Sequence, residues 1–390
     1  MNLDAEARAT LDEAGRAEGW ALPLLQALVE TNSHADNAAG LAACHRLLAP
    51  RLEALGLATR PMRTSAGALV RDHLLAETPA VAGPTVLLLG HLDTVYPPDE
   101  VFPFVVDGPR WRGPGIADMK GGVVTALVTL ALLARRGAFT RARFRLLLVS
   151  DEEQGSPTGA PALDRAARDA SLALAFEAAR TCGNLVVARK GQGIATVVVR
   201  GASGHAGIDH GRAGNALTAL ARVVVAAEEL EALAPCLTVS PGGAVTVTPA
   251  ALSCIPDRAT CELEWRFYDE AAGARVVDEL TARAAAIATS ERVTIEVDAR
   301  IETPPMAPSP ASELLVGRYA AAARRLGMDV RGVHTAGVGD INRAARAGAT
   351  CLDGVGPEGG GFHSRDEFLV IDSIARRAAM NAMALCDHLR

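Results

Sequence analysis

Four short clusters of histidine and acidic residues stand out in this sequence, because each lies at the end of an apolar run or among glycines. Imidazole and carboxylate groups are side chains that bind zinc and related divalent ions, and no cysteine lies beside these clusters. Taken alone, each cluster also has an ordinary explanation, such as a surface loop or a helix cap. The clusters read GHLDTV at 90–95, GPGIADMKGG at 113–122, SDEEQGS at 150–156 and GGGFHS at 359–364.

The first two clusters could bind a metal ion through His91 and Asp118. His91 and Asp93 follow the apolar run Thr85–Leu89, and they lie on one face if the chain stays extended. A metal-bound imidazole usually donates its other N–H to an acceptor, and Asp93 could provide or support that acceptor. Asp118 follows glycines that let the backbone turn sharply toward a ligand, although it could equally cap the apolar helix that comes next.

The third cluster places three carboxylates, Asp151, Glu152 and Glu153, directly after the apolar run Phe144–Val149. At the end of a buried strand, adjacent negative charges repel one another and favour a compensating cation. One glutamate could ligate that cation while its neighbour stays free as a base. A solvated acidic turn is the alternative, and it fits Asp151 better than it fits all three together.

His363 and Glu177 complete the candidate set. His363 follows three glycines, a setting that fits close approach of the backbone to a ligand better than core packing. Glu177 ends the apolar run Leu172–Phe176 and is a weaker candidate, since a lone glutamate after a strand needs no special function. A carboxylate shared by two ions would hold them about 3.5–4 Å apart, as in hydrolytic two-metal sites. The residue types predict zinc, with cobalt or manganese also compatible.

The elements that must position these residues follow from the apolar pattern of the first half. Short, wholly apolar runs are typical of strands buried on both faces, and here they alternate with helical spacing. This order predicts an α/β fold with a mostly parallel sheet and helices on both faces. Functional loops of such sheets follow the carboxyl ends of the strands. The expected helices are 5–31, 39–55 and 121–136, and the expected strands are 85–89, 144–149 and 172–176.

The middle of the chain predicts a smaller, inserted domain. Residues Arg258–Phe267 alternate between apolar and polar side chains, which indicates a sheet with one solvated or partner-facing side. The order of elements is β-α-β-β-α-β, the ferredoxin-like plan, and a Pro-rich linker follows at Thr303–Pro310. We therefore expect a catalytic domain in two parts, 1–190 and 304–390, interrupted by a lid or dimerisation domain at 191–303. The expected strands of that domain are 194–200, 244–248, 258–267 and 292–298, and its helices are 214–233 and 270–289.

The bulk properties exclude several classes of function. The net charge of -6 lacks the basic footprint of a nucleic-acid-binding protein. The longest apolar run, around 123–134, is too short to cross a bilayer, and the acidic residues 1–21 lack the pattern of a secretory signal. Seven dispersed cysteines without a CxxC pair indicate reduced thiols. We therefore expect a cytoplasmic protein that binds neither nucleic acid nor membrane.

Taken in order, the clusters resemble those of the zinc-dependent M20 metallopeptidases. Together with GHAG at 204–207 and GNAL at 214–217, they match the motifs of that family from about Ala27 to Leu389. Within the family, the likeness is to the bacterial glutamate carboxypeptidase group. The resemblance implies a zinc-peptidase catalytic domain, an inserted ferredoxin-like lid domain and hydrolysis of an amide bond beside a free carboxylate.

The resemblance also implies a role for each matching residue of the catalytic domain. Glu152 would be the general base, and Asp93 would orient His91. The peptide bond between Asp118 and Met119 would be cis, as is usual in the family. Two zinc ions per chain would be bound by His91 and Glu177, by Glu153 and His363, and by Asp118 as the shared ligand.

By the same resemblance, two residues of the inserted domain would act on the substrate. His205 would stabilise the oxyanion in the active site of a partner subunit, and Arg266 would bind a terminal carboxylate, for which a guanidinium is well suited. Ser253 stands at a substrate-binding position where the family has asparagine. The other departures are Ala178 for a proline, 336–340 for Gly-Gly-Thr-Ser-Asp, and Asn184 near a basic residue of glutamate recognition, so a glutamate preference is left open.

Three functions are consistent with this site. The favoured one is a carboxypeptidase or N-acyl-amino-acid hydrolase acting on a dipeptide-like substrate with a free carboxylate. A deacylase of small N-acylated metabolites or an N-carbamoyl-amino-acid hydrolase would use the same chemistry. A non-catalytic, amino-acid-binding relative is disfavoured because no ligand or base is missing. We also expect a homodimer through the inserted domain, because helix 214–233 carries a second apolar stripe of Val223, Val224, Leu230 and Leu233.

Overall fold

The computed structural model describes residues 4–100, 102–179, 183–249 and 251–390, so Cys182 lies outside the described residues. The chain divides into two compact units, whose main boundaries at 188/189 and 307/308 lie near the expected 190/191 and 303/304. Each unit has its own hydrophobic core. Unit 1 consists of Met1–Ala188, Pro308–Thr335 and Gly339–Arg390, and unit 2 consists of Arg189–Ala307 and Ala336–Val338.

Unit 1 contains a six-stranded sheet in the order β1-β2-β6-β3-β7-β16. β6, β3, β7 and β16 are parallel, whereas β1 and β2 are antiparallel at one edge, so the expected mostly parallel sheet is confirmed. The apolar runs of β3 and β6 are buried along almost their whole length, as strands covered on both faces must be. The bounds are β1 Ala58–Ala66, β2 Leu69–Glu77, β3 Thr85–His91, β6 Arg143–Val149, β7 Ala170–Ala175 and β16 Thr350–Leu352.

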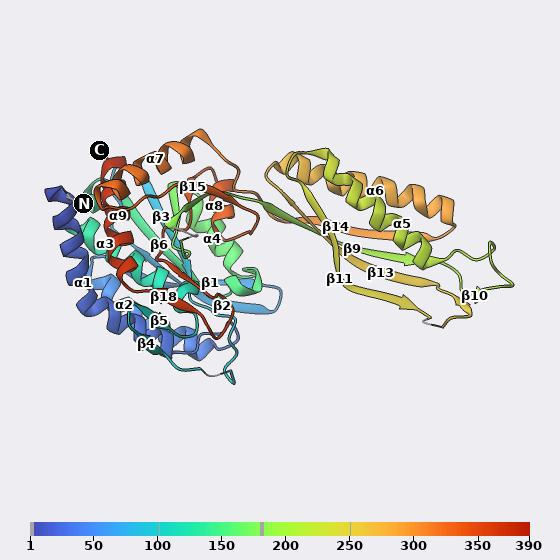
Figure 1. Ribbon diagram of the computed structural model, residues 1–390, viewed down its shortest axis with the longest axis horizontal. Coiled ribbons are helices and arrows are strands. Elements are labelled where there is room, and N and C mark those ends of the chain that lie inside the picture. The colour runs from blue at the N-terminus through green and yellow to red at the C-terminus, as the bar shows by residue number, and fades with distance from the viewer. Residues whose placement is uncertain (1–3, 101, 180–182, 250) are drawn as a thin grey trace. The chain divides into compact units, whose positions relative to one another are not determined.

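Helices cover both faces of this sheet. Figure 1 shows α1, α3 and α9 on one side of β3 and β6, and α4 and α8 on the other. α3 packs against α1 and α9, and α4 packs against α8. The bounds are α1 Ala5–Glu30, α2 Ala38–Ala54, α3 Gly121–Arg135, α4 Gly159–Ala167, α7 Pro310–Arg325, α8 Ile341–Arg346 and α9 Asp372–His388.

The most apolar helical segment of the described chain is α3 with the turn before it. By length and composition alone, residues 116–135 could cross a membrane, but 89% of the apolar window is buried inside the protein. Helices α1 and α9 pack against α3. The segment is therefore a core helix, whose first turn follows directly on Asp118.

The hairpin of β1 and β2 is an element that the sequence pattern does not predict. Its strands mix charged, polar and apolar residues, and β1 contains Pro61, so neither strict alternation nor an apolar run marks them. The hairpin gains its burial from tertiary pairing, because β2 pairs with β6 and buries Leu74 and Leu75.

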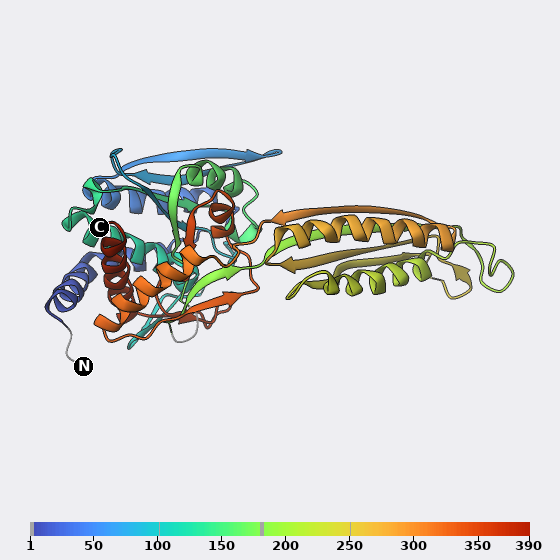
Figure 2. The ribbon, with the colours of Figure 1, turned by 90° about the horizontal axis from the view of Figure 1, so that it is seen from above.

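Unit 2 contains a four-stranded antiparallel sheet in the order β11-β13-β9-β14. Seen from above in Figure 2, α5 and α6 lie side by side over one face of this sheet. The buried residues of β13 are Cys261, Leu263, Trp265 and Phe267, as the alternation predicts. The bounds are β9 Gly191–Arg200, α5 Ala216–Glu228, β11 Thr238–Thr248, β13 Arg258–Phe267, α6 Glu270–Glu291 and β14 Thr294–Thr303.

The second apolar stripe expected on helix 214–233 is wrong in its residues. The α-helix gives way to a 3-10 turn at Glu229–Leu233, which changes the angle between successive side chains. The exposed apolar residues of α5 are instead Leu217 and Val225, with 45% and 58% of their surface exposed. The four expected residues, Val223, Val224, Leu230 and Leu233, belong to the core of unit 2 or pack against it.

Candidate functional site

The expected metal ligands come together because three neighbouring parallel strands of unit 1 end at one edge of the sheet. β3 ends at His91, Glu153 lies in the turn that follows β6, and Glu177 follows β7. The other two ligands come from separate segments. Asp118 lies in the turn before α3, and His363 lies in the loop after β17 (Gly359–Gly360).

Asp118 lies between two groups of candidate ligands. Its Oδ1 atom is 3.2 Å from Nε2 of His91, and that nitrogen is 3.8 Å from Oε1 of Glu177. Its Oδ2 atom is 3.3 Å from Nε2 of His363, and that nitrogen is 3.2 Å from Oε2 of Glu153. Each carboxylate oxygen of Asp118 is thus grouped with one histidine and one glutamate.

This donor set fits divalent zinc. In a tetrahedral zinc site with bonds of about 2.0–2.1 Å, neighbouring ligand atoms lie about 3.3 Å apart. Three of the four pair distances, 3.2, 3.3 and 3.2 Å, match that spacing. His91, Asp118 and Glu153 offer ligand atoms that all lie within 4.8 Å of one another. Histidine nitrogens and carboxylate oxygens are also ligand types that zinc accepts.

The ionisation of these groups reflects crowded negative charge. Burial raises the pKa of Glu153 to about 7, and burial together with the charge of Asp118 raises the pKa of Glu177 well above its usual range. A hydrogen bond with Asp118 raises the pKa of His363 to about 9. The crowded negative charge therefore stabilises the protonated forms of Glu153, Glu177 and His363. A divalent cation among these groups would offset the same negative charge.

Asp93 links two of the candidate ligands. It is fully buried, and Nδ1 of His91 lies 3.0 Å from its carbonyl oxygen and 3.5 Å from Oδ1. The backbone N–H of Glu153 donates to Oδ2 of Asp93 at 2.9 Å. With an acceptor at Nδ1, a neutral His91 carries its proton there, which leaves the lone pair of Nε2 available to a cation.

Glu152 and Asp151 have different surroundings in the turn after β6. Asp151 is fully buried and accepts hydrogen bonds from the backbone N–H and hydroxyl of Thr158, at 2.8 and 2.6 Å. The alternative of a solvated turn therefore does not apply to Asp151, because this carboxylate ties the turn to the start of α4. Glu152 is only partly buried, and its charge contributes to the raised pKa values of both Glu153 and Glu177.

The backbone is unusual at two of the ligands. The peptide bond between Asp118 and Met119 is cis, as the family resemblance implies. His363 has a φ of 58°, in the left-handed region that non-glycine residues seldom occupy, and Gly361 before it has a φ of 71°. Such residues cluster at functional sites, where the surrounding structure holds them in place.

His205 and Ser253 lie side by side in unit 2. His205 is in β10 (Gly204–His205), which pairs with β12 (Cys254–Ile255), and the N–H of Ala206 donates to the carbonyl of Ser253 at 2.9 Å. The backbone N–H groups of Gly207 and Ile208 lie 3.1 and 3.3 Å from Nδ1 of His205. Because Nδ1 accepts, the neutral ring carries its proton on Nε2, and the side chain is exposed.

Arg266 is bound by a neighbouring carboxylate. Its Nε and Nη2 atoms donate to the two oxygens of Glu264 at 2.8 and 3.0 Å, and 21% of the arginine side chain is exposed. Gln192 also donates to Glu264, at 2.7 Å. The alternation of β13 placed Arg266 and Glu264 on one face, but it did not predict this bidentate ion pair.

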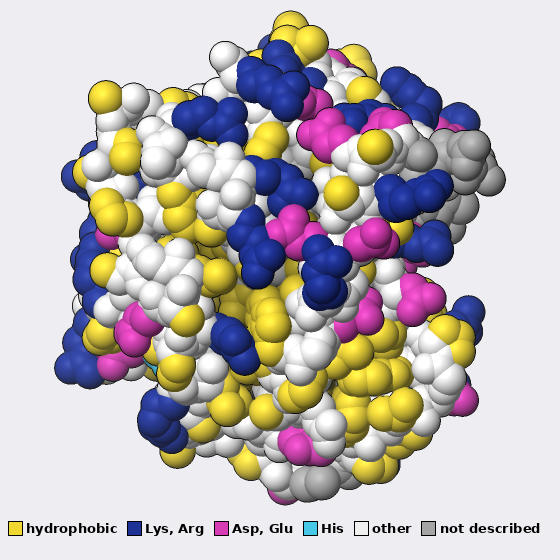
Figure 3. Space-filling model, turned by 90° about the vertical axis from the view of Figure 1, so that its left-hand side faces the viewer, with side chains coloured by type: hydrophobic (Ala, Val, Ile, Leu, Met, Phe, Trp, Pro, Cys, Tyr) yellow, Lys and Arg dark blue, Asp and Glu magenta, His cyan; other side chains and the backbone are white. Residues whose placement is uncertain are grey.

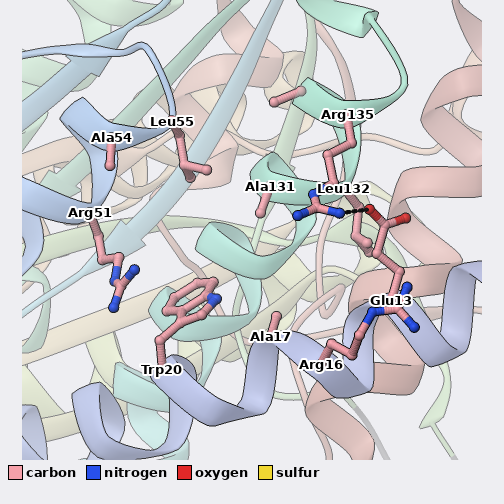
Figure 4. Close-up of a pocket in the computed structure, with 11 residues that line it drawn as sticks. Glu13, Arg16, Ala17, Trp20, Arg51, Ala54, Leu55, Ala131, Leu132 and Arg135 are labelled. Atoms are coloured by element: carbon pink, nitrogen blue, oxygen red, sulfur yellow. Dashed lines mark ion pairs between the residues drawn. The ribbon is translucent and has the colours of Figure 1, made fainter.

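A separate hollow of about 540 Å³ lies between α1, α2 and α3 (Figure 4). The guanidinium of Arg51 stacks over Trp20 at 4.8 Å, and Glu13 pairs with Arg135 at 3.2 Å. The residues that line this hollow include no member of the metal cluster, so we do not assign it to the site. On the face shown in Figure 3, basic side chains are interspersed with acidic and apolar ones, which gives no support for a nucleic-acid surface there.

Two residues beside the cluster were missed by the sequence reasoning. Glu367 is fully buried and accepts hydrogen bonds from the backbone N–H groups of Ala117 and Asp118, at 2.8 and 2.9 Å. Burial raises the pKa of Asp340 to about 8, and this carboxylate accepts a hydrogen bond from the hydroxyl of Ser156 at 2.6 Å. In the sequence, Glu367 is marked only by its position, four residues after His363 and just before the short strand β18 (Phe368–Val370).

The chain resembles known proteins in both sequence and fold. Residues 87–386 match the family model described as peptidase family M20/M25/M40. The chain is 29% identical to carboxypeptidase G2 of Pseudomonas sp. over 380 residues, which cover 93% of this chain and 88% of that protein. It is 32% identical to succinyl-diaminopimelate desuccinylase of Methylobacterium sp. over 217 residues, which cover 52% of this chain and 54% of that protein. The fold is similar to that of aminopeptidase PepT of Bacillus cereus, with a TM-score of 0.81, 19% identity and coverage of 94% of this chain and 97% of that chain.

Asp118→Ala should lose more bound metal than either His91→Ala or His363→Ala, because its two oxygens lie 3.2 and 3.3 Å from Nε2 of His91 and Nε2 of His363, and it would serve both ions. Metal per chain would be measured by mass spectrometry after zinc supply and gel filtration. Asp329→Ala removes an exposed carboxylate and is the control. Equal losses in the three ligand variants would argue against a shared ligand, and one ion in the unmodified protein would exclude a two-metal site.

Proposed function

This chain belongs to peptidase family M20/M25/M40, and we propose that it is a two-zinc hydrolase that releases a C-terminal amino acid from an amide-linked substrate. The observation that carries the proposal is Asp118, whose two oxygens are each grouped with one histidine and one glutamate. A shared carboxylate of this kind is a feature of hydrolytic two-metal sites. The relation to carboxypeptidase G2 supports an amino acid as the leaving group.

The proposed ligands are His91 and Glu177 for one ion and Glu153 and His363 for the other, with Asp118 shared. When bound, the ions supply a water of lowered pKa and a Lewis acid for the amide carbonyl. Cobalt or manganese would satisfy the same donor set.

Glu152 is the proposed general base. It follows β6 and lies next to the proposed ligand Glu153 in the sequence. Its charge contributes to the raised pKa values of Glu153 and Glu177, which belong to different ligand groups. We propose that its carboxylate takes a proton from the attacking water and passes that proton to the nitrogen of the leaving amine. Asp93 keeps His91 in the tautomer that frees Nε2, as its contact with Nδ1 supports.

His205 is the proposed hydrogen-bond donor to the oxyanion. The two N–H groups at Nδ1 support a proton on Nε2, so the exposed edge of the ring can donate without becoming charged. Following the family resemblance, we propose that this ring acts in the active site of a partner subunit. Ser253, whose carbonyl is bound by the residue after His205, would contact the same substrate.

Arg266 is the proposed site for the terminal carboxylate of the substrate. Its bidentate pair with Glu264 supports the geometry, because a substrate carboxylate would use the same two N–H donors. Binding would then require the substrate to displace Glu264 or to share the guanidinium with it.

We propose a homodimer through α5 of unit 2. Leu217 and Val225 are exposed on this helix, eight residues apart in sequence, and Leu217, Ala221 and Val225 therefore form one helical stripe. A second copy of this helix would cover the stripe in a two-fold interface. This stripe replaces the one expected from the sequence.

A second candidate function is removal of an acyl group from a small N-acylated metabolite. The partial match to a succinyl-diaminopimelate desuccinylase favours it. The two functions share the metal ligands and the base, so they differ only in the acyl and amine parts of the substrate. Turnover of one acyl group on a panel of amino acids, and of several acyl groups on one amino acid, would separate them.

Glu152→Gln should retain both metal ions and the fold but should lower kcat by roughly 10²–10⁴-fold, the contribution of a positioned base. Metal content and circular dichroism would be measured beside turnover. The neighbouring change Glu153→Gln is the matched control, since it removes a proposed ligand and should reduce metal content. Full activity of the Glu152 variant would place the base elsewhere.

Arg266→Ala should lower kcat/KM for substrates with a free terminal carboxylate, by roughly 2–5 kcal/mol at most, and by less where the substrate must displace Glu264 from the guanidinium. The same substrates amidated at that end should be poor for both proteins. Glu264→Gln leaves the guanidinium in place and weakens its partner, so it should not raise KM. Equal turnover of amides and free acids by the unmodified protein would rule out a carboxylate clamp.

Mixing of two inactive variants tests whether His205 acts on a partner subunit. Glu152→Gln chains and His205→Ala chains would be unfolded together and refolded, and hybrid dimers would be isolated with two affinity tags. If His205 acts across the dimer, each hybrid has one intact site, and activity should return to about half per dimer. Hybrids that form but stay inactive would show that His205 acts within its own chain or not at all.

A further inference from the structure

Glu367 is a fully buried carboxylate that lies beside the metal cluster without being one of its proposed ligands. Its Oε1 atom accepts hydrogen bonds from the backbone N–H groups of Ala117 and Asp118, at 2.8 and 2.9 Å. Its Oε2 atom accepts from the N–H of Gly115 at 2.9 Å and from the hydroxyl of Tyr96 at 2.8 Å. With four donors on two oxygens, the carboxylate is saturated by protein groups and has little capacity left to ligate an ion.

These four hydrogen bonds join three segments that carry proposed ligands. Tyr96 follows the segment of His91, the N–H donors lie in the turn of Asp118, and Glu367 itself lies in the segment after His363. The hydroxyl of Tyr96 also lies 3.0 Å from the carbonyl of Ser364, the neighbour of His363. One side chain therefore connects the shared ligand to the loops of both histidine ligands.

We propose that Glu367 is a positioning residue that fixes the backbone of Asp118, so that the two oxygens of Asp118 stay divided between two metal ions. This inference rests on the two-metal function proposed above and assigns Glu367 no contact with substrate or metal. The chemistry of the contacts supports it. The N–H of Asp118 itself is one of the donors, so a shift of Glu367 moves the ligand directly.

A carboxylate is the side chain that this position requires. All four partners are donors, and only a carboxylate offers two oxygens that both accept. Burial raises the pKa of Glu367, while the hydrogen bonds from Asp118, Ala117 and Tyr96 oppose that rise and stabilise the charged form. A glutamine would point its amide N–H₂ either at the N–H of Gly115 or at the N–H groups of Ala117 and Asp118, so in each orientation at least one buried backbone donor would lose its acceptor.

The turn that Glu367 holds has little freedom to adjust. Gly115 has a φ of 69°, and a Cβ atom there would come within 2.4 Å of the methyl group of Thr94. The phenol of Tyr96 remains protonated, because burial and the charge of Glu367 raise its pKa, so it stays a donor. The turn, the tyrosine and the carboxylate thus form one fixed assembly behind the ligand.

The test is the affinity of the protein for zinc, measured by competition with a chromogenic chelator. Glu367→Gln should bind zinc about 10- to 100-fold more weakly, the usual cost of losing a partner behind a metal ligand. In the zinc-loaded enzyme, kcat should fall while KM is retained. Glu77→Gln is the matched control, because Glu77 is a largely buried carboxylate held by Arg60, Arg143 and Arg145, none of which is a proposed ligand. It should lower the thermal stability without changing the zinc affinity.

Tyr96→Phe removes one of the four donors and decides the question if Glu367→Gln fails to fold. It should weaken zinc binding by roughly 2- to 10-fold, the equivalent of one hydrogen bond. If the unmodified protein binds two zinc ions and the folded variants bind them equally well, Glu367 has no positioning role. If the unmodified protein binds fewer than two zinc ions, the proposed function itself is at fault.

Discussion

The structure of unit 1 depends on one electrostatic constraint, the concentration of carboxylates at one edge of a buried parallel sheet. Asp118, Glu153 and Glu177 lie there together, and burial raises the pKa values of the two glutamates. Negative charges in such an environment are costly unless cations lie among them. A parallel sheet produces this crowding, because the loops that follow its parallel strands all lie at the same edge of the sheet. The crowding that is costly for these carboxylates alone would therefore favour divalent cations among them.

The surrounding residues hold this arrangement through contacts that leave the ligand atoms free. Asp93 occupies Nδ1 of His91 and the backbone N–H of Glu153, and so presents both side chains in a fixed orientation. Asp151, although it belongs to the same acidic run, caps the start of α4. The carboxylates of this region thus divide into those that could meet an ion and those that accept protein N–H groups. This division follows from which carboxylates have protein hydrogen-bond donors within reach.

The sequence predicted the parts of the structure that local patterns determine. The parallel strands follow from wholly apolar runs, and the clustering of the candidate metal ligands follows from histidines and acids placed where those runs end. The hairpin of β1 and β2 could not be predicted, because its burial arises from pairing with β6. Glu367 has no local pattern either, since its four donors come from segments distant in sequence. The stripe on α5 was misplaced because helical periodicity gives the apolar faces of a helix but not which of them meets the sheet.

The two units carry different parts of the proposed chemistry. The proposed base and metal ligands belong to unit 1, whereas the proposed oxyanion donor His205 and the proposed substrate contacts Ser253 and Arg266 belong to unit 2. Because Arg266 is already paired with Glu264, a substrate carboxylate that bound it as proposed would gain only the difference between its own contact with the guanidinium and the contact that it replaces. The proposed contact would thus orient a substrate by its terminal carboxylate, a group that all C-terminal amino acids share, and would not distinguish their side chains.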